Sequence, residues 1–489
     1  MLRRLAAGSG LVLLAGLALV LLVSRPAGAY DAGYHWDLTR DALAGQGFGA
    51  DATALVEVNN FYPDAFASAD EVIADRWVKA LRLDHDWDAL FGPASLRQAS
   101  DTYLHFSKLG STAEVTAGWD RLVRNTYRAA KQAEGQNDPR AFLVVLGTSL
   151  HAVQDFYAHA NWSGLDFAHQ EADLRVVPAG HEDPTWFDVP VAERGRADVY
   201  TTARSPQESL GKDDAGAPGF ARSYREAYYA SAQWAQLVQS WVGESFGKAA
   251  RRVAAPEVAE ERDFLKSLAW YGGHWKGLSS QGYVDLAAVG VKYLRHADRA
   301  GIAEWAAYAP ILTGEPDAGP APVVSPAQVA RVDWLEVRFT RVRQSDEDLI
   351  LTIDPFGSPD FYVKVTVNDR EYLEAKYVDK KDISPASWLT LVPLAPGLDR
   401  VTVKVAVWDE DVVGGGVLPS LRGKDDLCDI LPALGARVWF ADITLADLPE
   451  AGRVVSTDGV RPDHAKRASH GDGKEAAVEF TIRLVEPED

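Results

Sequence analysis

The pattern of apolar and polar positions divides this 489-residue chain into two halves. From Tyr34 to about Tyr308, apolar residues recur at helical spacing, as between Ala217 and Phe246, where tyrosines and tryptophans are set among alanine, glutamine and arginine. Strand-type alternation is hardly seen in this half. The pattern predicts an all-α helical bundle over residues 30–309.

The C-terminal half follows a period of two instead. Segments 334–339, 362–367 and 401–407 alternate as half-buried strands do, and turn-rich stretches separate them. This predicts an all-β antiparallel sandwich over residues 331–489. Between the halves, residues 310–330 hold five prolines mixed with glycine and alanine, a composition that does not continue a helix and indicates an interdomain linker.

The first 29 residues are typical of a secretory signal peptide. Arg3 and Arg4 precede an apolar run from Leu11 to Val23, and the small residues Ala27–Ala29 form a cleavage site. The apolar run is short for a transmembrane helix. An uncleaved anchor and a twin-arginine export signal are the alternatives. We therefore expect a secreted protein that begins at Tyr30.

The chain carries a formal net charge of -20 at pH 7. A broad basic face for nucleic acid is therefore not expected. The acidic excess suits calcium binding or simple solubility. Cys428 is the single cysteine, so no intramolecular disulfide stabilises the fold. Nothing in the sequence indicates a protein partner.

Residues 138–162 read DPRAFLVVLGTSLHAVQDFYAHANW and carry the most chemistry. Asp138 can cap a helix, the proline after it fits the first turn, and the apolar run predicts one long buried helix. His151, Asp155 and His159 stand at i, i+4 and i+8 and share one helix face. Imidazoles and a carboxylate in this spacing suit a zinc site, and a buried polar network is the alternative.

The segment HAVQDFYAHANW, preceded by LGTSL, resembles the signature of Het-C-like proteins and, more distantly, secreted zinc-dependent phospholipases C and fungal zinc nucleases. Those folds are helical bundles with a multi-zinc cleft. The resemblance implies zinc ligands from the motifs YHWDLTRDAL, FYPDAF and LHF and from the central helix, namely His35, Asp64, His105, His151 and Asp155. His159 is the sixth predicted zinc ligand, on the ground of its helical spacing. Weaker candidates for the same site are His169, His181, Glu182 and His274.

The resemblance also implies a chemistry, with two or three zinc ions acting on a phosphodiester. One ion polarises a phosphoryl oxygen and another lowers the pKa of a water molecule. Asp64 would orient or deprotonate that water, next to His151 and Asp155 as the other catalytic residues. The chain departs from the phospholipases in its shorter step from Asp155 to His159 and in having Tyr30 where they have an N-terminal tryptophan.

Aspartates also gather in the loops of the predicted sandwich. Asp354 and Asp360 flank a tight loop that leads into a strand, and Asp409 and Asp411 follow another strand. Calcium takes six to eight oxygen ligands, which neighbouring loops can collect at one end of a sandwich. The alternative is that these aspartates only form turns. We predict a shared calcium site.

The segments DPFGSPDFYVKV, KYVDKKDISPASW and WDED resemble the C2 domain, a calcium-dependent phospholipid-binding module. The resemblance implies five calcium ligands, namely Asp354, Asp360, Asp409, Asp411 and Asp426. An insertion before Asp426 is longer than the spacer of that family, so Asp425 is an alternative ligand. Its apolar residues, with Phe356, are expected to dip into lipid headgroups, or else to pack as an ordinary loop.

The sequence thus favours a secreted zinc-dependent phosphodiesterase of phospholipase C type, which a calcium-binding domain docks peripherally on a phospholipid membrane surface. The alternative is a non-catalytic, Het-C-like protein that binds membranes through calcium or acts as a toxin. A zinc nuclease is less favoured because the chain is acidic.

Overall fold

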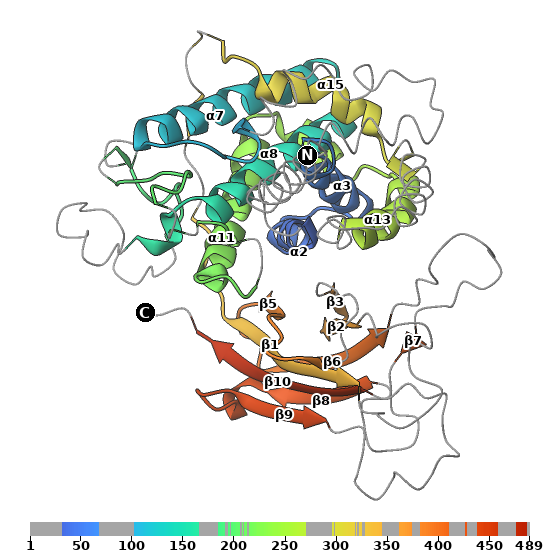
Figure 1. Ribbon diagram of the computed structural model, residues 1–489. Coiled ribbons are helices and arrows are strands. Elements are labelled where there is room, and N and C mark those ends of the chain that lie inside the picture. Colours follow the sequence, from blue (N-terminus) through green and yellow to red (C-terminus); the bar gives the residue numbers. More distant parts are fainter. Residues whose placement is uncertain are drawn as a thin grey trace, which may run out of the picture.

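The computed structural model contains a helical half and a β half that pack against each other (Figure 1). It describes residues 32–67, 102–165, 184–190, 194–195, 197–205, 208, 210–212, 215–269, 296–297, 299–317, 319, 322–324, 328–344, 361–373, 382–409, 426–427, 438–457 and 476–486. The predicted signal peptide lies outside these residues.

Helix α8 (Pro139–His159) is the centre of the helical half, and every residue from Ala141 to His159 is buried. Asp138 Oδ1 accepts hydrogen bonds from the backbone N–H groups of Arg140 and Ala141, so the predicted cap is confirmed. Among the described residues, the helical stretch that includes α8 is also the one long and apolar enough to cross a membrane. Its complete burial identifies it as a core helix.

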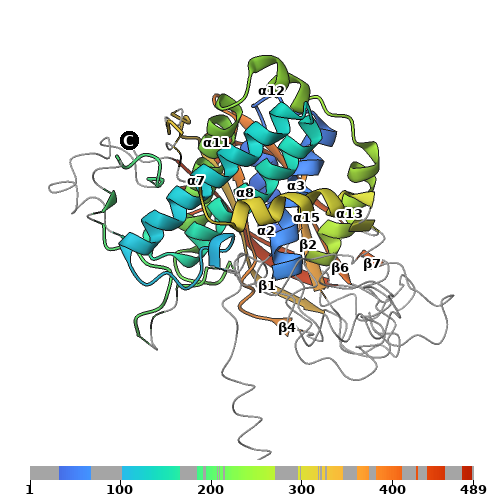
Figure 2. The same cartoon turned by 90° about the horizontal axis from the view of Figure 1, so that it is seen from above.

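The other helices surround α8. In the view from above, α7 and α3 run beside it and α11 lies beneath them (Figure 2). Their bounds are α2 (Ala32–Leu43), α3 (Ala50–Ala67), α7 (Thr112–Gly135), α11 (Phe220–Ser240), α12 (Glu244–Ala250), α13 (Pro256–Ala269) and α15 (Ile302–Thr313), with a 3-10 turn at Trp162–Gly164.

A glycine sets the separation of α3 and α8. A Cβ atom added to Gly147 would lie 2.4 Å from the carbonyl oxygen of Val56 and 2.9 Å from the Cβ of Asn59. Both neighbours belong to α3, so the missing side chain lets the two helices approach closely. This contact lies between the helices that carry Asp64 and His151.

The predicted linker begins inside a helix. Pro310 lies within α15, which continues to Thr313. The proline removes only one backbone donor, so the residues after it still close the last turn of the helix. Gly314 N–H donates to the carbonyl of Pro310, and Thr313 Oγ1 donates to that of Ala309. The next residues lie along α7, where Arg121 and Arg128 pair with Glu315 and Asp317.

The β half consists of two antiparallel sheets. The strands are β1 (Trp334–Gln344), β2 (Phe361–Val367), β3 (Arg370–Leu373), β4 (Asp382–Ile383), β5 (Leu389–Pro393), β6 (Arg400–Asp409), β7 (Asp426–Leu427), β8 (Val438–Thr444), β9 (Arg453–Thr457) and β10 (Ala476–Val485). One sheet has the order β4-β1-β10-β9 with β5 also on β1, and the other β3-β2-β6-β7 with β8 also on β6.

The three segments with predicted strand alternation all lie in these sheets, within β1, β2 and β6. Their inward side chains, such as Val337, Val365 and Val405, belong to one buried core between the sheets. This arrangement confirms the predicted combination of a helical region with an antiparallel β region.

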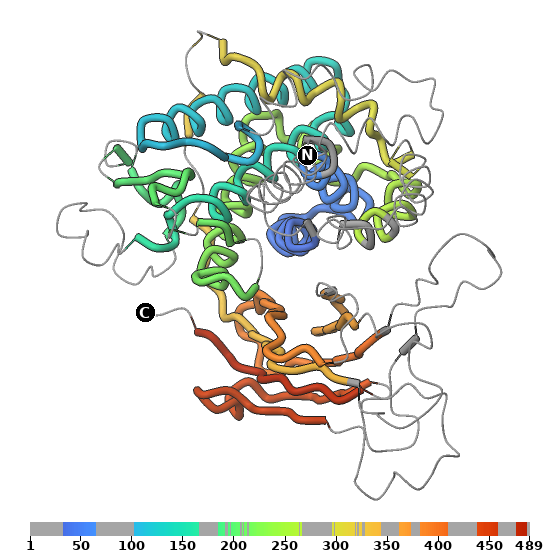
Figure 3. The backbone as a smooth tube through the Cα atoms, in the orientation of Figure 1, coloured from blue at the N-terminus to red at the C-terminus, as the bar shows by residue number. Residues whose placement is uncertain are grey.

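The two halves share buried surface. Trp334, Leu389 and Leu391 of the sandwich belong to the same apolar core as the helical residues. Trp334 Nε1 donates to the hydroxyl of Tyr229 on α11 at 3.1 Å. Figure 3 shows the start of β1 next to the lower end of α11, and Figure 1, in the same orientation, shows β3 and β5 on the side of the sandwich that faces the helices. The core is therefore continuous across the junction.

Candidate metal centre

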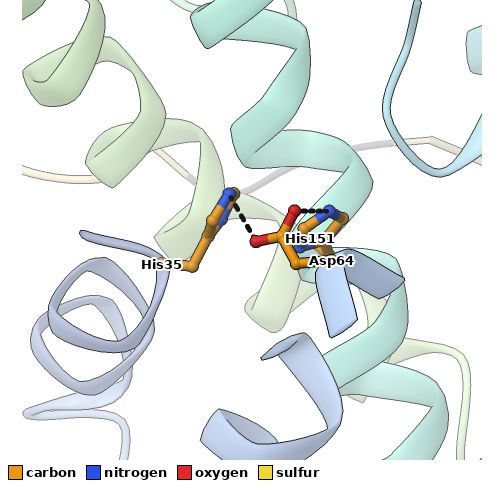
Figure 4. Close-up of side chains that lie close together, drawn as sticks. All are labelled: His35, Asp64 and His151. Atoms are coloured by element: carbon orange, nitrogen blue, oxygen red, sulfur yellow. Dashed lines mark ion pairs between the residues drawn. The ribbon is translucent and has the colours of Figure 1, made fainter. Parts of the chain in front are cut away.

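Five of the six predicted zinc ligands converge between α2, α3, α8 and the segment before α7. His35 comes from α2, Asp64 from α3, and His151 and Asp155 from successive turns of α8, while His105 precedes α7. Figure 4 shows Asp64 between His35 and His151, with its carboxylate facing both rings. Helical spacing alone brings together only His151 and Asp155. The other three ligands reach the site because their segments pack against α8.

Asp155 is the inner carboxylate of the cluster and is fully buried. Its Oδ1 lies 3.0 Å from His35 Nε2. Its Oδ2 lies 2.8 Å from His105 Nδ1 and 3.2 Å from His151 Nε2. The two oxygens of Asp155 thus face different histidines.

The two oxygens of Asp64 also face different histidines. Its Oδ2 lies 3.9 Å from His35 Nε2, and its Oδ1 lies 3.9 Å from His105 Nδ1 and 3.8 Å from His151 Nε2. The donors therefore form two groups: a His35 half-site with one oxygen of each carboxylate, and a His105/His151 half-site with the other oxygen of each. Both carboxylates span the two half-sites.

The spacing of these atoms fits metal coordination. Ligand atoms about 2.1 Å from a tetrahedral zinc lie about 3.4 Å apart, and the nitrogen–oxygen separations here run from 2.8 to 3.9 Å. Imidazole nitrogen and carboxylate oxygen are donors that zinc accepts. The His35 half-site contains three protein donors and the His105/His151 half-site contains four. A tetrahedral ion held by the His35 half-site would therefore take one further ligand.

The protonation states of His151 and Asp155 suit a metal, whereas the raised pKa of His35 means that this imidazole must release a proton when it binds one. Burial lowers the pKa of His151, which favours the neutral imidazole. Burial alone would raise the pKa of Asp155, but the neighbouring His151 and His35 outweigh it and hold that pKa well below its usual range. Burial would lower the pKa of His35, but the Asp155 carboxylate raises it overall. An ionised carboxylate beside a neutral imidazole is the state that binds a metal ion.

His159 lies on α8, as predicted, but outside this cluster. Eight residues separate it from His151, which is about 12 Å along a helix. Its Nδ1–H donates to the backbone carbonyl of His105 at 2.7 Å. His159 thus contacts the backbone of the segment that holds His105. His169, His181, Glu182, His274 and Tyr30 lie outside the described residues.

Two buried amides that the sequence did not single out contact the imidazoles. Gln154 Oε1 lies 2.7 Å from His35 Nδ1, and Asn60 Oδ1 lies 3.3 Å from His151 Nδ1. Their positions carry a weak signal, because Gln154 follows His151 by three residues and Asn60 precedes Asp64 by four. Each amide therefore lies near the face of the helix that bears the ligand.

The predicted calcium ligands are described in part. Asp354, Asp360, Asp411 and Asp425 lie outside the described residues, and only the backbone of Asp409 and Asp426 is described. Asp409 pairs with Phe361 on one side of β6 and with Asp426 on the other.

This register has two consequences for the predicted site. Phe361, which follows Asp360, lies at the same end of the second sheet as Asp409 and Asp426. Asp426, which follows the long insertion, is paired with Asp409, so the insertion does not separate these two positions.

Comparisons with known proteins give limited information. The chain matches no family model and no curated protein. Partial likenesses occur to human GIVD cytosolic phospholipase A2 (11% identity, TM-score 0.20, 32% of this chain and 17% of that chain), an isolated C2 domain (16%, 0.19, 31% and 97%) and a C2 domain of plant extended synaptotagmin 1 (10%, 0.22, 33% and 100%). TM-scores this low do not establish a shared fold.

Proposed function

We propose that the helical half is a zinc-dependent phosphodiesterase of phospholipase C type and that the sandwich docks it on lipid through calcium. The observation that carries the first part is the position of the two carboxylates. Asp155 and Asp64 each turn one oxygen to His35 and the other to His105 and His151. This arrangement suits two divalent ions that share both carboxylates.

The donor set favours zinc, with three imidazoles and two carboxylates. His35, Asp155 and Asp64 would hold one ion, and His105, His151 and the same two carboxylates the other. A zinc pair, when bound, supplies Lewis acidity toward a phosphoryl oxygen and lowers the pKa of a water molecule toward neutrality.

The two carboxylates have different roles. Asp155 is fully buried and lies closer to the imidazoles, so it would hold the ions in place without taking part in proton transfer. The side chain of Asp64 is 15% exposed and lies farther from all three rings. Asp64 therefore borders the solvent side of the centre, where it can orient a water molecule and accept its proton.

The substrate class follows from the resemblance of the central helix and from the charge of the chain. A phosphodiester is the substrate that the zinc-phospholipase signature implies, and a net charge of -20 disfavours nucleic acid. A phospholipid surface fits a secreted protein with a calcium-binding sandwich. The proposed calcium ligands are Asp354, Asp360, Asp409, Asp411 and Asp426.

Metal counting on the full chain tests the proposal. We expect the wild type to hold two zinc ions per chain after dialysis and to hydrolyse a chromogenic phosphocholine ester. His151→Ala should lose at least one of the two ions and all of the hydrolysis. His296→Ala is the matched control, because it removes a histidine that pairs with Glu261 outside both half-sites, and it should keep two ions. No bound zinc and no hydrolysis in the wild type would favour the non-catalytic, membrane-binding alternative.

A further inference from the structure

Four uncharged polar side chains meet behind the imidazoles. They come from four different helices, and each is completely buried; they are Thr39 of α2, Asn60 of α3, Gln154 of α8 and Ser231 of α11. We refer to them as the amide network. Buried polar groups of this kind add little net stability over well-packed apolar side chains. Stability alone therefore gives no reason for four helices to converge on them.

Gln154 is the centre of the network and fills its hydrogen-bonding capacity. Its Oε1 faces His35 Nδ1 at 2.7 Å and accepts from Asn60 Nδ2 at 3.0 Å. Its Nε2 donates to Thr39 Oγ1 and Ser231 Oγ, each at 3.2 Å. An amide can make four such bonds, and all four are made here.

These bonds suit the orientation in which the Gln154 amide oxygen faces His35. Asn60 Nδ2 also donates to Thr39 Oγ1 at 2.8 Å, so the amide nitrogens of Asn60 and Gln154 both point to hydroxyls. The oxygen of each amide is left facing an imidazole. In this orientation His35 and His151 each donate from Nδ1–H, His35 to Gln154 and His151 to Asn60.

The consequence for the centre is a choice of tautomer. A neutral imidazole that donates from Nδ1 carries its lone pair on Nε2. Nε2 is the atom of both rings that faces Asp155 and Asp64. The two rings are stacked, with centroids 4.4 Å apart and planes inclined by 29°, so the network aims two lone pairs at adjacent half-sites.

We propose that Gln154 and Asn60 are positioning residues that hold His35 and His151 in the Nδ1–H tautomer, with Nε2 directed to the metal ions. The inference rests on the proposed metal centre. It assigns a ligand-orienting role to two residues that do not themselves bind a metal. Outer groups that orient a histidine ligand typically contribute about 10- to 100-fold to metal affinity.

The test measures zinc affinity of the full chain by competition with a chromophoric chelator, without any enzyme assay. Gln154→Met keeps the side-chain length and removes the acceptor, so zinc should bind about 10- to 100-fold more weakly. Gln154→Glu restores an acceptor for His35 Nδ1–H and should recover affinity relative to Gln154→Met. Thr148→Val is the matched control: it removes an equally buried hydroxyl of α8 that donates to the carbonyl of Val144 and lies outside the amide network, and it should change affinity less than about 3-fold.

Two further measurements separate positioning from misfolding. The metal-free variants should keep wild-type circular dichroism, and the absorption spectrum of bound Co²⁺ should change in Gln154→Met but not in Thr148→Val. If the wild type binds zinc and Gln154→Met and Thr148→Val bind it equally well, the positioning role is wrong while the metal centre stands. If the wild type binds no zinc, both the proposed function and this inference are wrong.

Discussion

The hydroxyl of Tyr372, in strand β3, donates a 3.0 Å hydrogen bond to Oδ2 of Asp41, in helix α2. Both side chains are buried although they belong to different halves of the molecule. The Arg40 guanidinium lies 4.5 Å from the centre of the Tyr372 ring and donates to the backbone carbonyl of Glu371. Arg370 completes the contact, 3.5 Å from Asp41.

Removing this hydroxyl should weaken the junction. In Tyr372→Phe, the buried Asp41 carboxylate loses a donor, and we expect the free energy of unfolding to fall by about 1 to 2 kcal/mol. Chemical denaturation followed by tryptophan fluorescence measures the change, because Trp334 lies at the junction. Tyr127→Phe, on a half-buried tyrosine of α7 that packs on Trp241, is the control and should change stability far less. Equal effects would show that the Asp41 contact is unimportant.

Gly147→Ala should disturb both the fold and the metal centre. The added methyl would lie 2.4 Å from the backbone oxygen of Val56, so α3 must move away from α8. We expect a loss of about 3 kcal/mol in the free energy of unfolding, as for other overpacked cores, and weaker zinc binding because Asp64 moves with α3.

A second glycine provides the comparison for Gly147. A Cβ atom added to Gly135, at the end of α7, meets no atom within 4 Å. Gly135→Ala should therefore leave stability and zinc content close to those of the wild type. If Gly147→Ala also matched the wild type on both counts, the close approach of α3 and α8 would not control the centre.

The buried Glu57 predicts a pH dependence. Burial raises its pKa from 4.5 to about 7, against the opposing charges of Arg262 and Lys266. Between these values the unfolded chain binds fewer protons than the folded one, so the contribution of Glu57 to stability falls as the pH rises from about 4.5 to 7. Glu57→Gln should stabilise the protein at pH 8 by at most about 3 kcal/mol.

The difference should vanish near pH 4, where Glu57 is protonated in both states. Thermal unfolding of both proteins at pH 4, 6 and 8 measures it. A gain that is the same at all three pH values would mean that the Glu57 charge is not its source.

The proposed calcium site predicts conditional membrane binding. Wild-type protein should sediment with phosphatidylserine-containing liposomes in calcium and stay in solution in chelator. Asp409→Asn should weaken the calcium-dependent binding, because the substitution removes a carboxylate charge at the end of the sheet where Asp426 pairs with it. Asp442→Asn is the control, since Asp442 pairs with Arg400 at the opposite end of β6. Equal binding in chelator would contradict the docking proposal.

Local signals make much of this molecule predictable. The cap at Asp138, the apolar run behind it and the spacing of His151 and Asp155 all act within one helix, and the structure places them as the sequence predicts. The strand alternation is equally local. Helical spacing also suggests His159, but it does not report distance along the axis, and the i+8 position lies beyond the cluster.

The remainder depends on contacts between distant residues. Asn60 and Gln154 are 94 residues apart, and either amide alone is an unremarkable polar side chain in an apolar helix. Tyr372 and Asp41 are separated by 331 residues, so no periodicity in the sequence could link them. Such contacts appear only when the helices and strands are in place.

The single core that runs through Trp334 and the helical half has a consequence for how the protein can be divided. Each half, expressed alone, would present a face of tyrosine, tryptophan and leucine to water, and Asp41 would lose the hydrogen bond from the Tyr372 hydroxyl. A sandwich exchanged for that of another protein would have to reproduce this face as well. The sandwich is therefore not a portable module, and the two halves are expected to be inherited, truncated and engineered as one unit.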